Sequence, residues 1–411
     1  MTTAHRHQEL GSSASNERGE PPSVPWASAR IAAYAAPDPL PPDTVPLADA
    51  LGTTLAAPLV ATVSLPAFDC AAMDGYAVGS ATGPWRVVGR VLAGHGIPTP
   101  LREDEAVEIA TGAPTPVGAV AVLPQEQATV LGAAVHGEVV PDRHLRPAGE
   151  DAVAGRQLLP AGTPVTATIL GLAAAVGGDV LAVRPRPRVA ALLTGDELVH
   201  RGLPGDGRVR DAVGPTLPGL VRWLGGEPVL VLPVPDTPED QLAAAVDAAD
   251  GEVIVTVGGA AHGPADRLCG TLARLRARTV VPSVACRPGH PQRLALLPDG
   301  RWLVGLPGNP YAALVASLTL LGPLIAGLTG RPLPVLPTAT FAPPSHPTHT
   351  PPGAHDFARV VPVHRISGGR VEPVGHDRPG SLWGAALADA LAVVPAGWTG
   401  EPVPLVALPP A

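Results

Sequence analysis

Residues 188–198, RVAALLTGDEL, decide the fold of this chain. Five apolar residues at 189–193 run without interruption into the polar quartet Thr194-Gly195-Asp196-Glu197. A continuous apolar run of this kind is typical of a strand buried on both faces of a parallel sheet. The quartet then lies at the carboxyl end of the strand, where open α/β sheets form their ligand crevices. Taken alone, the stretch also fits a buried strand followed by a solvated acidic turn.

The segments that follow show the alternation expected of such a sheet. Apolar strands are predicted at residues 189–193, 229–234, 253–257 and 303–306, with helices at 216–224 and 238–249 between them. Strands that alternate with helices of about ten residues indicate a parallel sheet covered by helices on both faces. Before this region, short strands at close spacing predict a β-rich insert. The last 60 or so residues predict a small β-domain.

Composition limits the classes of function. The chain has 411 residues, too many for one core, and a net charge of −8 without a basic run, which argues against a nucleic-acid partner. All 28 basic residues other than histidine are arginine. Cys70, Cys269 and Cys286 form neither a zinc motif nor a disulfide framework, which favours the cytoplasm. Residues 311–330 carry no charge, but Gly322-Pro323 interrupts them, so we predict a buried helix and no membrane span.

Three loops are expected to meet at one edge of the sheet: TGDEL (194–198), VGGAAHGPAD (257–266) and GLPGNP (305–310). Glycine turns such as Gly258-Gly259 and Gly308 leave backbone N–H groups bare, which suits a phosphate. Glu197 and Asp266 would repel that phosphate unless a cation lies between them. Phosphate with Mg²⁺ is therefore the consistent pair, although glycine turns without any ligand remain an alternative.

Other catalytic classes fit poorly. The chain contains no G-x-S-x-G motif, which argues against an α/β-hydrolase. It contains no G-x-x-x-x-G-K-[ST] motif and no lysine, which excludes a P-loop nucleotidase.

Seven motifs occur in the order known from one family: LPAFDCAAMDGYAV (65–78), EIATGAPTPVGAVAVLPQE (108–126), RPAGEDAVAG (146–155), RVAALLTGDEL (188–198), VGGAAHGPAD (257–266), RPGHP (287–291) and GLPGNP (305–310). With these motifs the sequence resembles the molybdopterin molybdenumtransferase family, of the bacterial MoeA and gephyrin E-domain type, from about residue 45 to the C-terminus.

The resemblance implies a multi-domain α/β plus β fold. Its expected parts are an elongated linker domain of two segments (25–60 and 141–186), a β-rich insert (61–140), a doubly wound molybdopterin-binding α/β domain (187–333) and a C-terminal β-barrel-like domain (334–411). Residues 1–24 are polar and contain no apolar signal core, so their composition predicts a disordered tail. The resemblance also implies a homodimer whose cleft joins the α/β domain of one subunit to the insert of the other. Molybdopterin adenylyltransferase and molybdoenzymes are further possible partners.

The implied reaction inserts molybdate into adenylylated molybdopterin with Mg²⁺ and releases AMP. By motif, the residues with implied catalytic roles are Asp74, Thr111, Asp151, Glu197 and Asp266, of which Glu197 and Asp266 would hold the metal or act as general base. Those expected to bind the pterin substrate are Thr194, Gly195, Asp196, Gly258, Gly259, Arg287, His290, Pro307, Gly308, Asn309 and Pro310.

The sequence departs from the family pattern at several positions. The family's K-P-G-K-P is here RPGHP (287–291), so Arg287 keeps a charge with a different geometry, and His290 replaces a permanent cation. A serine of the diglycine loop is Ala261, the D-S-N segment is Asp211-Ala212-Val213, and a later serine pair is Ala385-Ala386. Two alternatives therefore stand beside an active transferase: a non-catalytic or altered paralogue that binds pterin or scaffolds cofactor assembly, and a different nucleotide-phosphate hydrolase.

Overall fold

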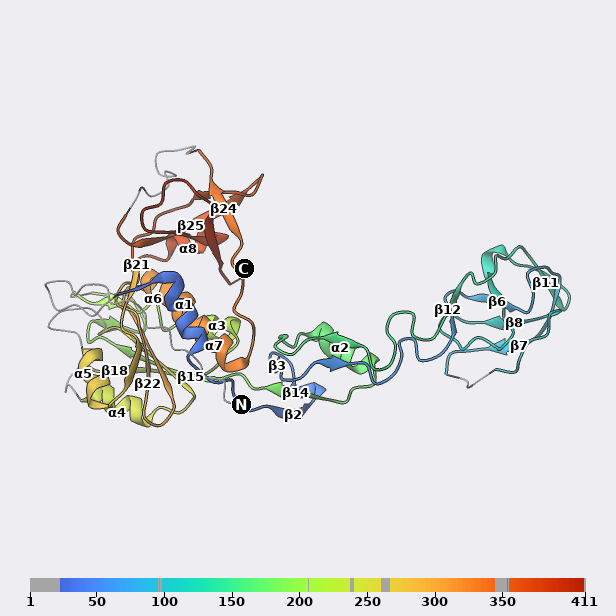
Figure 1. Cartoon of the computed structure of the whole chain (residues 1–411), viewed down its shortest axis with the longest axis horizontal. Coiled ribbons are helices and arrows are strands. Elements are labelled where there is room, and N and C mark those ends of the chain that lie inside the picture. The colour runs from blue at the N-terminus through green and yellow to red at the C-terminus, as the bar shows by residue number, and fades with distance from the viewer. Residues whose placement is uncertain are drawn as a thin grey trace, which may run out of the picture. The chain divides into compact units, whose positions relative to one another are not determined.

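The computed structural model describes residues 23–94, 96, 98–205, 207–236, 240–259, 267–343, 353 and 355–409. The chain forms two compact units (Figure 1). One consists of residues 43–51 and 55–183, and the other of residues 1–42, 52–54 and 184–411. Most of the tail predicted to be disordered lies outside the described residues.

A six-stranded sheet organises the larger unit. Its strand order is β18 (Glu227–Val234), β15 (Arg188–Thr194), β19 (Val253–Val257), β23 (Trp302–Leu306), β22 (Arg293–Leu296) and β20 (Arg278–Val281). The first four strands are parallel, as predicted, whereas β22 runs antiparallel to β23, and β20 runs antiparallel to β22. The connection at residues 297–301 is too short for the crossover that a parallel neighbour of β23 would need.

Helices cover both faces of this sheet and explain the unbroken apolar run of β15. Val189, Ala191 and Leu193 pack in a core with α3 (Leu217–Leu224) and the helices at 310–329, whereas Ala190 and Leu192 pack against α4 (Gln241–Ala248) and α5 (Arg267–Arg274). Because alternate side chains of a strand point to opposite faces, both sets must be apolar. The predicted doubly wound α/β domain is confirmed.

The apolar stretch after β23 forms one continuous helix. It consists of α6 (Pro310–Ala316), the π-helical segment η3 (Ser317–Leu321) and α7 (Gly322–Thr329). Pro323 has no N–H and cannot donate the usual helical hydrogen bond to the carbonyl four residues before it. The π-helical turn lies just before Pro323 and accommodates this loss, so the helix continues through Gly322-Pro323. Among the described residues this is the one helix long and apolar enough to cross a membrane, and 94% of an 18-residue apolar stretch within it is buried inside the protein, as predicted.

The helix α1 (Trp26–Ala35) packs in this larger unit, although sequence analysis grouped it with the linker segments. Its small side chains Ala29 and Ala33 are fully buried in the core that α7 shares. A Cβ on Gly327 of α7 would lie 2.3 Å from the carbonyl oxygen of Tyr34, so the two helices touch through backbone. Small residues at the contact make this approach possible. The sequence around residue 30 does not show that α1 packs on α7.

The C-terminal domain is a small closed β-barrel, as predicted. Its strands are β24 (Thr338–Phe341), β25 (Ala358–Ile366), β26 (Arg370–Pro373), β27 (Ala390–Val394) and β28 (Val403–Ala407), and pairing of β27 with β25 closes it. β21 (Val284–Arg287) of the α/β region pairs in parallel with β25, and β1 (Val24–Pro25) pairs with β21. This pairing joins the barrel to the α/β domain.

The smaller unit contains the predicted β-rich insert. Six strands form one sheet in the order β10 (Thr129–Leu131), β11 (Ala134–His136), β7 (Trp85–Val91), β8 (Glu105–Ile109), β6 (Gly75–Val78) and β9 (Ala121–Pro124). A second core joins two distant segments, with Ala50, Leu55 and Leu59 packing against Val165, Ala173 and Leu181. Its regular elements are β2 (Asp43–Pro46), β3 (Thr54–Leu55), β4 (Leu59–Val60), β13 (Gln157–Leu159), α2 (Ala167–Ala175) and β14 (Val180–Arg184).

The contact between α1 and α7 is tested by replacing Gly327 with alanine. Alanine favours a helix over glycine by about 0.5–1 kcal/mol, but here its Cβ meets the Tyr34 carbonyl, so we expect a net loss of about 1–3 kcal/mol in the free energy of unfolding. Gly270→Ala in α5 is the matched control, because nothing lies within 4 Å of its added Cβ. Urea unfolding followed by tryptophan fluorescence measures both variants, and equal stability of the two would contradict the packing of α1.

Candidate active site

The ends of β15, β19 and β23 approach one another closely. The Thr194 hydroxyl donates a hydrogen bond to the Val257 carbonyl (2.9 Å), and the Gly258 N–H donates to the Leu306 carbonyl (3.1 Å). Gly258 has a φ of +92°, and a Cβ there would lie 2.7 Å from the Thr194 carbonyl oxygen. A Cβ on Gly308 would lie 3.5 Å from the Gly258 Cα. At Gly258 both the left-handed φ and the close Thr194 backbone require glycine, whereas the approach at Gly308 is an ordinary van der Waals distance.

A cavity of about 660 Å³ opens at this edge, and we call it the strand-end cavity. Nine residues predicted from the sequence line it: Thr194, Gly195, Glu197, Gly258, Gly259, Pro307, Gly308, Asn309 and Pro310. Asp196 does not line it. Its N–H donates to the Asp236 carboxylate (3.2 Å), and its own carboxylate accepts from the Asp236 N–H (3.0 Å), which holds the TGDEL loop.

Four charged residues that line this cavity were not predicted as site residues from the sequence: Arg210, Asp211, Asp236 and Arg267. Asp236 follows β18, and Arg267, at the start of α5, lies 3.4 Å from its carboxylate. The signal for Asp236 was present, because LPVPD (232–236) places an acidic residue after a strand that is parallel to β15. Carboxyl ends of parallel strands share one edge, so this residue belongs with the three loops.

The carboxylates of the strand-end cavity differ in their availability. Asp211 is buried and accepts hydrogen bonds from the N–H groups of Val213 (3.0 Å) and Gly214 (2.9 Å), while its other oxygen lies 3.2 Å from His200 Nδ1. It therefore shapes the turn before α3. Glu197 is exposed, and its carboxylate bonds to no other residue that the structure describes. Glu197 is thus the carboxylate best placed to meet a ligand.

Metal binding receives limited support from the described residues. No group of three or more His, Cys, Asp or Glu side chains among them could hold a metal ion. Asp266, the second predicted ligand, lies outside the described residues, as does Ala261. Mg²⁺ usually takes only one or two carboxylates and completes its shell with phosphate oxygens and water. The free Glu197 carboxylate fits that limited role.

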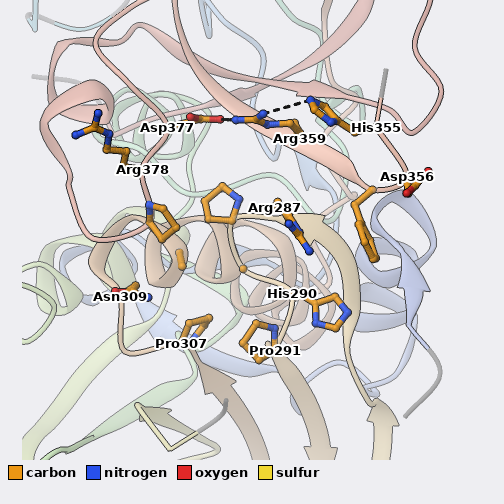
Figure 2. Close-up of a pocket in the computed structure, with 15 residues that line it drawn as sticks. Arg287, His290, Pro291, Pro307, Asn309, His355, Asp356, Arg359, Asp377 and Arg378 are labelled. Atoms are coloured by element: carbon orange, nitrogen blue, oxygen red, sulfur yellow. Dashed lines mark hydrogen bonds and ion pairs between the residues drawn. The ribbon is translucent and has the colours of Figure 1, made fainter. Parts of the chain in front are cut away.

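A second cavity of about 590 Å³ lies beside the first, and we call it the arginine-lined cavity (Figure 2). It shares Pro291, Pro307 and Asn309 with the strand-end cavity. Its charged and titratable lining residues are Arg287, His290, His355, Asp356, Arg359, Asp377 and Arg378. The predicted residues Arg287 and His290 therefore lie in this neighbouring cavity and not among the glycine turns.

Contacts within the arginine-lined cavity fix several of these side chains. The Arg287 guanidinium lies over the Phe357 ring, 5.2 Å from its centroid, and His290 Nε2 lies 2.8 Å from the Ser23 hydroxyl. Arg359 forms an ion pair with Asp377, and its Nη1 lies 3.2 Å from His355 Nε2 (Figure 2). Sequence reasoning missed the barrel residues, because only the pairing of β21 with β25 brings them to Arg287.

The three remaining predicted residues lie in the smaller unit. The N–H and hydroxyl of Thr111 both donate to one oxygen of Asp74, at 2.6 and 2.9 Å. These hydrogen bonds, the backbone one foremost, lower the pKa of Asp74 below its ordinary value. Asp151 accepts from Arg146 (2.6 Å), which also donates to Glu150 (2.8 Å). Arg146 lies in β12 (Leu145–Arg146), which pairs with β5 (Cys70–Ala71), a strand that begins four residues before Asp74.

The fold and the cavities define a class of protein: a doubly wound α/β domain with a ligand cavity at its strand ends, continued by a β-barrel that adds cationic groups. Family models match the chain in three segments. "MoeA N-terminal region (domain I and II)" matches residues 23–177, "Probable molybdopterin binding domain" matches 190–327, and "MoeA C-terminal region (domain IV)" matches 342–408.

Individual proteins show the same relationship. Molybdopterin molybdenumtransferase 2 of Mycobacterium tuberculosis is 34% identical over 373 residues, which cover 86% of this chain and 91% of the relative. The molybdopterin molybdenumtransferase of a Nostoc species is 34% identical over 310 residues, 70% of each chain. The crystal structure of a molybdopterin biosynthesis MoeA protein from Pyrococcus horikosii superimposes with a TM-score of 0.74 at 26% identity, covering 95% of this chain and all of the other. The chain belongs to the MoeA family of molybdopterin molybdenumtransferases.

The hydrogen bonds to Asp74 are tested by Thr111→Val, which removes the hydroxyl and leaves the backbone donor. We expect the pKa of Asp74 to rise part of the way to its ordinary value, measured by NMR titration of its carboxyl carbon. A depressed pKa stabilises the fold above the ordinary pKa, and this stabilisation is lost as the pH falls through the depressed value. The variant should therefore lose less stability on acidification. Thr129→Val on the exposed strand β10 is the control, and an Asp74 titration identical in both variants would refute the assignment.

Proposed function

We propose that this transferase of molybdenum cofactor biosynthesis inserts molybdate into adenylylated molybdopterin and releases AMP. The observation that carries the proposal is the pair of adjoining cavities that share Pro291, Pro307 and Asn309. One cavity is lined by glycine turns, although the Gly258 N–H, which was expected to be bare, already donates to the Leu306 carbonyl; the other cavity offers arginine side chains. Such a pair suits a substrate with a phosphate and a dithiolene on one side and an oxyanion on the other.

In the strand-end cavity, the turns at Gly258-Gly259 and Gly308 would hold the pyrophosphate of the pterin nucleotide. Thr194 and Gly195 would close one side of it, and Asn309 would face the boundary with the second cavity. Asp236 and Arg267 line the same cavity as an ion pair and would set the charge near the phosphates. These roles follow from the cavity's lining and from the chemistry of each group.

Mg²⁺ would neutralise charge on the phosphoanhydride as it is cleaved. Glu197 would hold it from the TGDEL loop, and Asp266 is proposed as the second carboxylate. Glu197 fits this role because its carboxylate is exposed at the cavity and bonds to no other described residue. The same carboxylate could instead take a proton as general base.

In the arginine-lined cavity, Arg287 would bind molybdate together with the barrel arginines. A guanidinium presents paired donors to an oxyanion, so Arg287 can replace the family's lysine with altered geometry. The family's second lysine is His290, which is held near Ser23 and gives no permanent charge. This cavity thus has fewer fixed cations from the RPGHP motif than the family pattern provides.

We further propose a cytoplasmic homodimer in which the partner subunit supplies Asp74, Thr111 and Asp151 to the cleft, as the family resemblance implies. A molybdopterin adenylyltransferase would deliver the substrate, and molybdoenzymes would receive the product. A second candidate function is favoured by the lost lysines and serines: a paralogue that binds the pterin without turning it over.

Molybdate-dependent AMP release from adenylylated molybdopterin tests the proposal directly. We expect release by the purified protein with Mg²⁺, and a loss of about 100-fold or more in Glu197→Gln, because that change removes the charge that holds the cation. Glu103→Gln, at an exposed position of the smaller unit, is the matched control and should retain full activity. Saturable pterin binding without AMP release from the unaltered protein would favour the non-catalytic paralogue instead.

A cleft shared between subunits predicts complementation. Glu197→Gln and Asp74→Asn should each be inactive alone, yet a mixed dimer keeps one cleft in which both residues are intact. Co-expressed chains that assort at random should then regain about a quarter of the unaltered activity. Mixed dimers can be isolated with two different affinity tags and assayed for AMP release. Failure of isolated mixed dimers to regain activity would show that each cleft is built from a single chain or that Asp74 is not part of it.

A further inference from the structure

A third cavity, of about 280 Å³, lies in the larger unit and shares no lining residue with the two cavities described above. It is bordered by α3, the π-helical turn and α7, the segment at 331–337 and barrel strand β28, and we call it the rear cavity. Its walls are mostly apolar, with Trp223, Leu318, Leu336 and Val406 among them. A cavity of this composition suits the apolar body of a small molecule.

Three arginines line this apolar cavity: Arg30, Arg331 and the exposed Arg365. Arg30 of α1 is only 9% exposed, its Nε has no hydrogen-bond partner, and its guanidinium lies over the Trp26 ring at 5.2 Å from the centroid. The Arg331 Nε donates to the fully buried hydroxyl of Thr54 (2.9 Å). Gly225 makes room for this side chain, because a Cβ there would overlap the Arg331 guanidinium.

The rear cavity lacks a counter-charge for these groups. None of the described residues that line it is acidic, and no described carboxylate forms an ion pair with Arg30 or Arg331. Burial alone lowers the pKa of both arginines. Arg365 differs because its side chain is exposed, and it is its backbone N–H that donates to the Asp389 carboxylate (2.8 Å). A buried cation without a partner costs free energy, so retaining one beside a cavity points to an anion that binds there.

We propose that the rear cavity binds a small organic acid, with its carboxylate on Arg30 and Arg331 and its apolar body against Trp223 and Val406. A guanidinium presents paired N–H donors that match a carboxylate, and a dry apolar wall strengthens that contact. The proposed ligand belongs to the class of aryl or short-chain alkyl carboxylates. Its binding is independent of the pterin reaction, because the rear cavity shares no lining residue with the other two cavities.

Calorimetry on the full-length protein tests this with two probes, 4-phenylbutanoate and its uncharged amide, 4-phenylbutanamide. We expect saturable binding of the carboxylate and binding of the amide that is weaker by about tenfold or more, because the amide lacks the charge. Arg30→Met should weaken the carboxylate by a similar factor and leave the amide unchanged. Arg278→Met, at an exposed position on β20, should change neither.

The outcomes separate a ligand site from a structural arginine. Equal affinity for both probes, no saturable binding at millimolar carboxylate, or unchanged affinity in Arg30→Met would overturn the proposal. Thermal unfolding supplies a second test, because removing an unpaired buried charge should not lower the melting temperature of ligand-free protein. A clearly lower melting temperature of Arg30→Met would show that Arg30 is structural. In that case Arg30→Lys, which keeps the charge, would have to restore the melting temperature. AMP release should be unaffected by Arg30→Met, whatever the outcome for the pterin reaction.

Discussion

The close approach of backbone at Gly258 is the constraint on which the rest of the site depends. Thr194 from β15 and Gly308 after β23 both come against this one residue, and its left-handed φ excludes an ordinary side chain. The carboxyl ends of β15, β19 and β23 can therefore lie close together. Their loops then surround one cavity. Glycine permits such contact because it has no Cβ. It also loses more conformational entropy on folding than other residues, so neighbouring contacts must hold its backbone in place.

The barrel contributes through a second constraint, the parallel pairing of β21 with β25. This pairing brings Arg359 and Asp377 to the RPGHP turn and creates a cationic cavity beside the glycine turns. The Tyr311 N–H donates to the Pro379 carbonyl (2.9 Å), and the Tyr311 hydroxyl donates to the Val360 carbonyl (3.0 Å). The start of α6 is thus fixed to the barrel, so the shared boundary at Asn309 is held from both sides.

Much of the fold could be predicted from sequence, because unbroken apolar runs such as 189–193 identify strands buried on both faces. Convergence of the three loops followed from the rule that parallel strands share a carboxyl edge. Long-range pairing could not be predicted, so Arg359 and the packing of α1 through Gly327 were missed. For the same reason, the sequence did not show that the predicted residues line two different cavities. Tertiary contacts place Arg287 in one cavity and Gly258 in the other, and short motifs do not encode these contacts.

The two adjoining cavities are proposed to hold the two halves of one reaction. A crystal structure of the protein with adenylylated molybdopterin and molybdate tests it most directly. We expect the pyrophosphate of the pterin nucleotide at Gly258 and Gly308, and the molybdenum anomalous signal beside Arg287 in the arginine-lined cavity. A pterin nucleotide bound away from the ends of β15, β19 and β23, or molybdate bound away from Arg287, would contradict it.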